Sequence, residues 1–237
     1  MALLTSDRLV VGDHENQSVK LVDIVQNEVL QQLELDSQPW RVCSLPGTRA
    51  AVTLPLNNTI LILDCAKQLS IVNRITVREE LQELAYSNGH LIVLYDFGKI
   101  EKLHMNGGVV RQNHLGTYIS YYYQHLSVTT EGNVTSIYVS DFDNSRILRL
   151  DENLQEQQVY PVPDSAELWC VLAVGDGQLL VSDLSGRLWQ LDSTMGRWTH
   201  LNQEKRIGFA YPMAFCHERN VLYYCSVIDA VKRYAIS

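Results

Sequence analysis

Short apolar runs and polar turns alternate along the whole chain. The runs are rich in Val, Ile, Leu and Tyr, and turn residues such as Asn57-Asn58 and Asn88-Gly89 separate them. Runs of this length between such turns are typical of β-strands joined as hairpins. No segment shows a convincing helical period, so the pattern predicts an all-β protein.

The strand-turn-strand unit repeats at a regular interval. Six copies begin at Leu9, Ala50, Leu91, Ile137, Leu179 and Val221. The successive spacings are 41, 41, 46, 42 and 42 residues. Short strands in repeats of about 40 residues indicate a β-propeller with four-stranded blades. The sequence therefore predicts a six-bladed β-propeller of four-stranded antiparallel blades, with residues 1–237 as a single domain.

The first and last repeats differ from the middle ones. The second repeat has four predicted strands, at residues 40–45, 49–54, 59–64 and 70–77. The first repeat has only residues 2–5 before its second strand, which predicts a shortened inner strand, and the last repeat ends with its third strand at 231–236. Since propellers usually complete one blade with strands from both termini, we expect this chain to be the C-terminal domain of a longer protein.

Composition and charge narrow the class of protein. The 237 residues are 46% hydrophobic and 19% charged, which excludes a disordered or low-complexity chain. The net charge of −8 disfavours nucleic-acid binding, because phosphate neutralisation needs a basic patch. The five Cys show no CxxC spacing, the chain begins without a signal peptide, and no apolar run could span a membrane. We therefore expect a cytoplasmic protein with reduced thiols, no zinc site and no membrane contact.

A motif with an aspartate at the end of a strand recurs within the repeats. In the fourth repeat the strand that begins at Ile137 ends in Asp141, and Asn144 and Arg146 follow before the next strand. The carboxylate can accept hydrogen bonds from N–H groups of the turn that it opens, so a structural role is expected. The matching acids are Asp13 and Asp183, whereas Leu54 and Cys225 stand there in the second and sixth repeats.

This pattern resembles the NHL repeat over nearly the whole chain. Propellers of this family form the C-terminal domain of tripartite-motif ubiquitin ligases, after a RING, a B-box and a coiled coil. None of those modules is present in these residues. The resemblance therefore implies a substrate-recognition domain without catalytic activity of its own, which binds a protein partner or, in some family members, RNA.

The residues just before each inner strand are expected to form the binding face. Aromatic side chains gather there in four of the five blades that can be read, although the chain is only 8% aromatic. Exposed Trp, Tyr and Arg are favoured at recognition sites, whereas Trp residues at this level can instead cap the core between blades. The predicted partner-binding residues are Trp40, Arg41, Tyr121, Tyr122, Tyr123, His125, Trp169, Phe209 and Tyr211.

Three other functions remain open from the sequence. RNA could bind a local patch formed by Arg41, Arg111, His125, Lys205 and Arg206. A propeller lactonase or esterase would hold a metal ion with carboxylates from the inner strands, where Glu83 and Glu167 are the available acids. The aromatic face would also suit a carbohydrate. The main prediction is a non-catalytic protein-binding module with no metal site, catalytic residue or cofactor.

Overall fold

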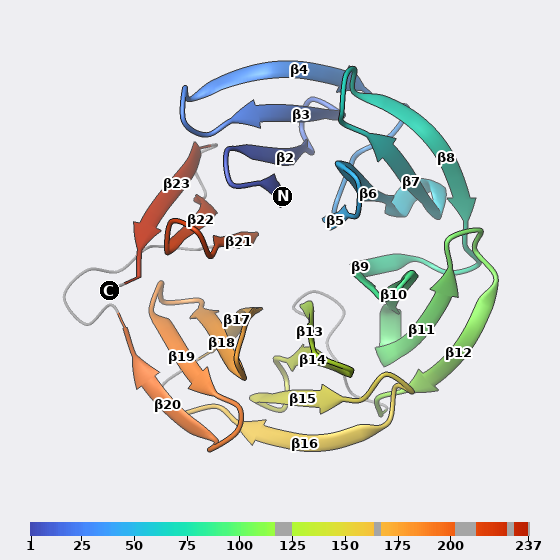
Figure 1. Ribbon diagram of the computed structural model, residues 1–237. Helices are drawn as coiled ribbons and strands as arrows, with labels where there is room; N and C mark the ends of the chain where they lie inside the picture. The colour runs from blue at the N-terminus through green and yellow to red at the C-terminus, as the bar shows by residue number, and fades with distance from the viewer. Residues whose placement is uncertain (117–124, 164–166, 202–211, 227–229, 237) are drawn as a thin grey trace. The chain divides into compact units, whose positions relative to one another are not determined.

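The strands of the computed structural model form six antiparallel sheets, each of them built from consecutive strands (Figure 1). The structure describes residues 1–116, 125–163, 167–201, 212–226 and 230–236. The chain divides into two compact units. The first comprises Met1–Asp96 and Ile100–Val110, and the second comprises Phe97–Lys99 and Arg111–Ser237.

Sheets one to three belong mainly to the first unit. The first sheet consists of β1 (Ala2–Thr5), β2 (Arg8–Asp13), β3 (Ser18–Asp23) and β4 (Glu28–Glu34). The second consists of β5 (Val42–Leu45), β6 (Arg49–Leu54), β7 (Thr59–Asp64) and β8 (Ser70–Thr76). The third consists of β9 (Leu81–Ser87), β10 (His90–Tyr95), β11 (Lys99–His104) and β12 (Val109–His114). Two short 3-10 turns, Pro55–Asn57 and Asp96–Gly98, follow β6 and β10.

Sheets four to six belong to the second unit. The fourth sheet consists of β13 (Leu126–Glu131), β14 (Val134–Asp141), β15 (Arg146–Leu150) and β16 (Glu156–Pro161). The fifth consists of β17 (Leu168–Gly175), β18 (Gln178–Asp183), β19 (Leu188–Asp192) and β20 (Arg197–His200). The sixth consists of β21 (Met213–Cys216), β22 (Val221–Ser226) and β23 (Ala230–Ala235). In the described part of the chain the sixth sheet has three strands.

The fold is a six-bladed β-propeller, as the repeat predicted. The inner strand of the first repeat lies at Ala2–Thr5, as expected, but its four residues equal the length of β5, so it is not shortened relative to that strand. Whether residues 1–237 form a single domain of a longer protein stays a prediction.

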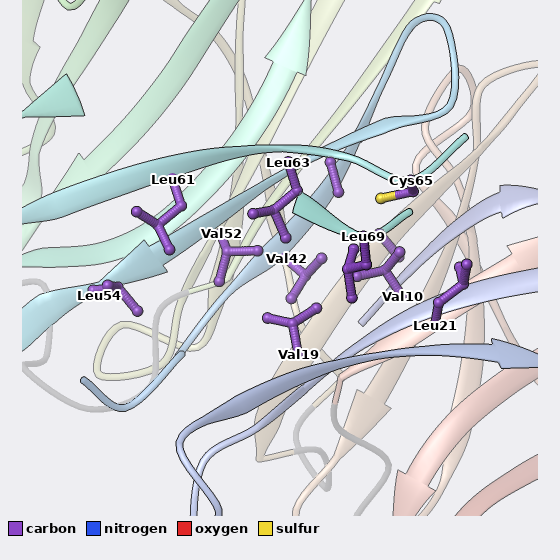
Figure 2. Packing of buried hydrophobic residues seen from close by; sticks show 12 residues of the cluster. Val10, Val19, Leu21, Val42, Val52, Leu54, Leu61, Leu63, Cys65 and Leu69 are labelled. Carbon is purple, nitrogen blue, oxygen red and sulfur yellow. The ribbon is translucent and has the colours of Figure 1, made fainter. Parts of the chain in front are cut away.

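Both faces of a blade are buried, and β7 shows why. Successive side chains of a strand point to opposite faces. Leu61 and Leu63 therefore pack into one cluster with residues of the first sheet, while Ile60 and Ile62 pack into another with residues of the third. Figure 2 shows the first of these clusters, in which Val10, Val19 and Leu21 face Val42, Val52, Leu61 and Leu63. The four consecutive apolar residues in the middle of β7, Ile60 to Leu63, thus follow from the position of this strand between two sheets.

The recurring aspartates open turns, as predicted. Asp13 accepts a hydrogen bond from the N–H of Asn16 at 3.1 Å, and Asp183 accepts one from the N–H of Ser185 at 2.9 Å. Asp141 accepts from the N–H of Asn144 at 3.3 Å. A basic side chain then pairs with each carboxylate: Lys20 with Asp13 at 2.5 Å, Arg146 with Asp141 at 2.7 Å, and Arg187 with Asp183 at 2.5 Å. The NHL-like motif therefore has a structural role, which is to stabilise the turn that follows each aspartate.

Two further properties concern covalent links and membranes. No disulfide joins the five cysteines. Burial raises the pKa of the Cys65 thiol to about 11, so this side chain stays a protonated core residue at neutral pH. Within the described ranges, no helix has the length and apolar character needed to cross a bilayer.

Candidate functional site

Arg41 and Glu83 occupy equivalent places in neighbouring sheets, 42 residues apart. The N–H of Arg41 donates to the Thr53 hydroxyl at 2.9 Å, and its carbonyl accepts from the N–H of Thr53 at 2.9 Å, just before β5. Glu83 lies opposite Leu94 at the corresponding level of β9 and β10. A cation and an anion therefore lie at the start of adjacent inner strands, and their separation is within one residue of the 41-residue spacing between the second and third repeats.

The two side chains form a buried ion pair. The Nε of Arg41 donates a hydrogen bond to Oε1 of Glu83, and the side chains are only 10% and 2% exposed. Burial raises the pKa of Glu83 to about 7, although the charge and hydrogen bond of Arg41 lower it. A carboxyl group with such a pKa can exchange a proton near neutral pH, which is the property of a general acid or base.

Aromatic rings lie against the Arg41 side of this pair. The guanidinium carbon of Arg41 is 4.8 Å from the centroid of the Trp40 ring, and Trp40 is 42% exposed. His14, in the turn between β2 and β3, meets the same indole edge-on at 5.5 Å, and its Nδ1 lies 3.4 Å from the carbonyl oxygen of Pro39. We call His14, Trp40, Arg41 and Glu83 the Arg41 site. It combines an accessible aromatic surface with a fixed cation and a titratable carboxyl.

His125 occupies the matching position in the fourth sheet, within the second unit. Its N–H donates to the Ser140 hydroxyl at 2.6 Å, and its carbonyl accepts from the N–H of Ser140 at 2.9 Å. This repeats the backbone pattern of Arg41 with Thr53. The carbonyl of Glu167, before β17, likewise accepts from the N–H of Leu184 at 2.9 Å, and Glu167 is exposed.

The predicted partner-binding residues fall into three groups. Trp40 is exposed and Trp169 half-buried, so both retain accessible ring surface. Arg41 and His125 are buried, at 9% and 8% exposure. The remaining predicted residues, Tyr121, Tyr122, Tyr123, Phe209 and Tyr211, lie outside the described residues, as do Lys205 and Arg206 of the suggested RNA patch.

The predicted residue set lacked two members of the Arg41 site. The sequence suggested Glu83 only as a metal-binding acid of a lactonase or esterase, and it assigned no role to His14. The signal for Glu83 was its separation from Arg41, which at 42 residues is within one residue of the spacing between the second and third repeats. Among the described residues, no three His, Cys, Asp or Glu side chains cluster closely enough to hold a metal ion.

Comparison with known proteins identifies the fold but no family. No protein-family model and no curated protein matches the chain. A Bacteroides caccae protein of unknown function superimposes with a TM-score of 0.70 at 14% identity, over 92% of this chain and 82% of the other. Virginiamycin B lyase from Staphylococcus aureus gives 0.68 at 12% identity, over 99% and 83%. The dihydro-heme d1 dehydrogenase NirN gives 0.62 at 12%, over 97% and 53%.

These similarities correct one prediction and leave another unsupported. The prediction that this propeller is not an enzyme is wrong. Proteins that share the propeller fold include a lyase and a dehydrogenase, so the fold points to possible catalytic activity. The resemblance to tripartite-motif NHL propellers finds no counterpart in the comparisons, which support a β-propeller and nothing narrower.

Proposed function

We propose that this chain is a propeller enzyme that cleaves an ester or lactone, with the Arg41 site as its catalytic centre. One observation carries the proposal: a buried Arg41–Glu83 ion pair lies beside the exposed ring of Trp40. The existence of a lyase with this fold adds support, because it shows that such a propeller can carry catalysis. This extends the lactonase or esterase alternative raised by the sequence.

Arg41 is suited to hold the carbonyl oxygen of a substrate. Glu83 fixes the guanidinium through Nε, and the Trp40 ring supports it at 4.8 Å. A planar cation fixed in this way stabilises the negative charge that develops on the carbonyl oxygen when a nucleophile attacks. The exposed indole offers a flat apolar surface for the rest of the substrate.

Glu83 is suited to move the proton of the reaction. Its carboxylate would take a proton from water as the water oxygen bonds to the carbonyl carbon. The resulting carboxylic acid would then return that proton to the alkoxide that leaves as the ester C–O bond breaks. A pKa of about 7 lets the group perform both transfers near neutral pH.

The experiment measures turnover of two probes, 4-nitrophenyl butyrate and dihydrocoumarin. Glu83→Gln keeps a hydrogen-bonding group beside Arg41 but cannot take up a proton, so kcat should fall about 10²- to 10⁴-fold. Glu28→Gln, which changes an exposed carboxylate in β4, is the matched control and should leave kcat unchanged. Failure of both probes to react, or equal turnover by Glu83→Gln and the parent, would reject the proposal.

A second candidate function is recognition of a protein partner at the same end of the blades. Trp40 is 42% exposed and Leu56, in the turn that follows β6, is 73% exposed. Large exposed apolar side chains of this kind are typical of recognition surfaces. Substrate recognition within a tripartite-motif ligase, and a cytoplasmic location, remain sequence-based predictions. RNA binding has less support, because Glu83 neutralises Arg41 and the chain carries a net charge of −8.

A further inference from the structure

A small polar pocket lies on the fifth sheet and shares no residue with the Arg41 site. It has a volume of about 230 Å³ and is lined by side chains of β18, β19 and β20 (Figure 1). All of the lining side chains are polar or charged: Gln178, Gln190, Asp192, Arg197 and Thr199. This volume equals that of roughly eight water molecules, which suits a small molecule rather than a peptide.

The strand register explains why the lining side chains share one face. They occupy directly facing positions of the three strands: Gln178 opposite Asp192, Asp192 opposite Arg197, and Gln190 opposite Thr199. Successive side chains of a strand point to opposite faces of the sheet. Leu179 and Leu191 therefore point the other way, into the apolar cluster that the fifth sheet shares with the fourth. The sheet thus has one apolar face for packing and one polar face that forms the pocket.

Asp192 supplies a fixed anion to this pocket. Its Oδ1 accepts hydrogen bonds from the hydroxyl of Thr194 at 2.6 Å, from the N–H of Thr194 at 3.0 Å and from the N–H of Met195 at 3.1 Å. These bonds, together with the side chain of Gln178, hold the pKa of Asp192 below its ordinary value, so the group is ionised at neutral pH. None of the three bonds uses Oδ2, so that oxygen can accept a hydrogen bond from a ligand.

Arg197 supplies a cation that faces Asp192 across the strands without pairing with it. Facing residues of opposite charge usually attract each other. Yet among the residues that the structure describes, neither Asp192 nor any other acid forms an ion pair with Arg197. Arg197 is also exposed. Because a planar guanidinium binds a carboxylate through two parallel hydrogen bonds, Arg197 is suited to hold the carboxylate of a ligand.

We propose that this pocket binds a free α-amino acid with a small polar side chain. The carboxylate of the ligand pairs with Arg197, and its ammonium group donates to Oδ2 of Asp192. The amides of Gln178 and Gln190, which are joined by a 3.0 Å hydrogen bond, and the hydroxyl of Thr199 offer hydrogen bonds to the ligand's side chain.

The lining favours this ligand over simpler ones. An anion without a positive group would meet the carboxylate of Asp192, and a cation without a negative group would meet the guanidinium of Arg197. A zwitterion complements both charges. A sugar is neutral, but none of the described residues that line the pocket is aromatic, so a sugar ring would have no apolar surface on which to stack.

Isothermal titration calorimetry on the intact chain tests the proposal with five probes, which are L-serine, L-threonine, L-asparagine, L-glutamine and L-aspartate. At least one should bind with a Kd of about 1 mM or lower. The α-amide of the tightest binder lacks the carboxylate, and its N-acetyl form lacks the ammonium group. Each derivative should bind about tenfold more weakly or not at all, because it loses one charged contact. D-Glucose is the neutral comparison and should not bind.

Substitutions locate the site. Arg197→Gln removes the cation at an exposed position and should weaken binding about tenfold or more. Asp192→Asn keeps an oxygen for the turn but removes the negative charge, and it should weaken binding similarly. Arg111→Gln, which changes an exposed arginine in the outer strand of the third sheet, is the matched control and should leave the Kd unchanged. NMR spectra should show shifts of the side-chain amides of Gln178 and Gln190 when the amino acid is added.

Four results would overturn the proposal. Absence of binding by all five amino acids at about 10 mM would remove the ligand class. Equal binding of the amide or the N-acetyl form would show that the two charges are not recognised. Equal binding by Arg197→Gln and the parent would place the ligand elsewhere, and binding of glucose would indicate a sugar site. None of these outcomes depends on catalysis at the Arg41 site.

Discussion

Arg41 and Glu83 lie 42 residues apart at equivalent positions, and the Nε of Arg41 donates to Oε1 of Glu83 where both side chains are almost fully buried. Removing water from two charges is costly, and their mutual attraction repays this cost only while both are present. The pair is therefore interdependent: each residue makes the burial of the other tolerable.

Replacing one partner should destabilise the protein much more than replacing both. Glu83→Leu or Arg41→Met alone leaves one buried charge unpaired, and each should cost about 3–5 kcal/mol of unfolding free energy. The double variant removes both charges and should cost far less than the sum of the single changes. Urea denaturation of the four proteins measures the coupling energy. Additive losses would mean that the two charges do not depend on each other.

The pH dependence of stability should report the raised pKa of Glu83. A carboxyl has a pKa of about 4.3 in an unfolded chain, whereas burial raises that of Glu83 to about 7, against the lowering effect of Arg41 and of the amino group of Met1. The folded state therefore holds this proton more tightly, so its contribution to stability is complete below about pH 4 and is lost as the pH rises toward 7. Urea midpoints measured across this range should show the decline.

Glu83→Gln is the control for that titration, because glutamine does not ionise. The variant should lose the decline in stability between about pH 4 and 7, while Glu28→Gln should keep it. If Glu83→Gln followed the same pH curve as the parent, a group other than Glu83 would be responsible for the decline.

The fold and its turns could be predicted because their causes are local or periodic. Strand pairing imposes alternation and regular spacing, which the repeat starts at Leu9, Ala50 and Leu91 display. The turn role of Asp183 depends on residues within six positions of it, namely Ser185, Arg187 and Trp189. Nearby residues in the sequence were therefore sufficient to indicate both features.

The burial and the contacts of the site residues could not be predicted in the same way. Arg41 was expected to face a partner, yet it is buried against a carboxylate contributed by a different sheet. Its burial depends on a contact between repeats, which no local pattern specifies. The same holds for His14, whose contact with Trp40 joins the first and second sheets. Catalytic competence depends on such contacts rather than on the repeat, so a resemblance carried by the repeat gave no basis for excluding it.

Asp183 should contribute more to the free energy of unfolding than Asp192, which precedes the next turn along the chain. Its fully buried side chain accepts hydrogen bonds from the N–H groups of Ser185 and Arg187 at 2.9 Å and from Nε1 of Trp189 at 3.2 Å. Asp183→Ala would leave these donors without their acceptor and should cost about 3 kcal/mol or more. Asp192→Ala, at the half-buried end of β19, should cost clearly less. Thermal or urea unfolding of both variants would show whether burial decides the difference.

Acid should act on Asp183 in the direction opposite to its effect on Glu83. Burial alone would raise the pKa of Asp183, but hydrogen bonds from Ser185, Arg187 and Trp189 outweigh it and lower the pKa. Its contribution to stability is therefore present above the ordinary pKa of an aspartate and is lost as the pH falls through the lower folded value. Asp183→Ala should flatten the acid limb of the stability curve. An unchanged limb would assign acid sensitivity to other carboxylates.

Gly107 should tolerate a methyl group much less well than Gly47. Both glycines adopt left-handed backbone conformations, with φ of +89° and +74°, so alanine is strained at either position and costs about 1 kcal/mol from this cause alone. A Cβ at Gly107 would also lie 2.7 Å from Cγ2 of Ile75, whereas one at Gly47 would have no atom within 4 Å. Ile75 is buried in the core and β-branched, so its methyl group has little room to move. Urea denaturation should therefore show a larger loss for Gly107→Ala than for Gly47→Ala, and equal losses would mean that the core beside Ile75 yields without cost.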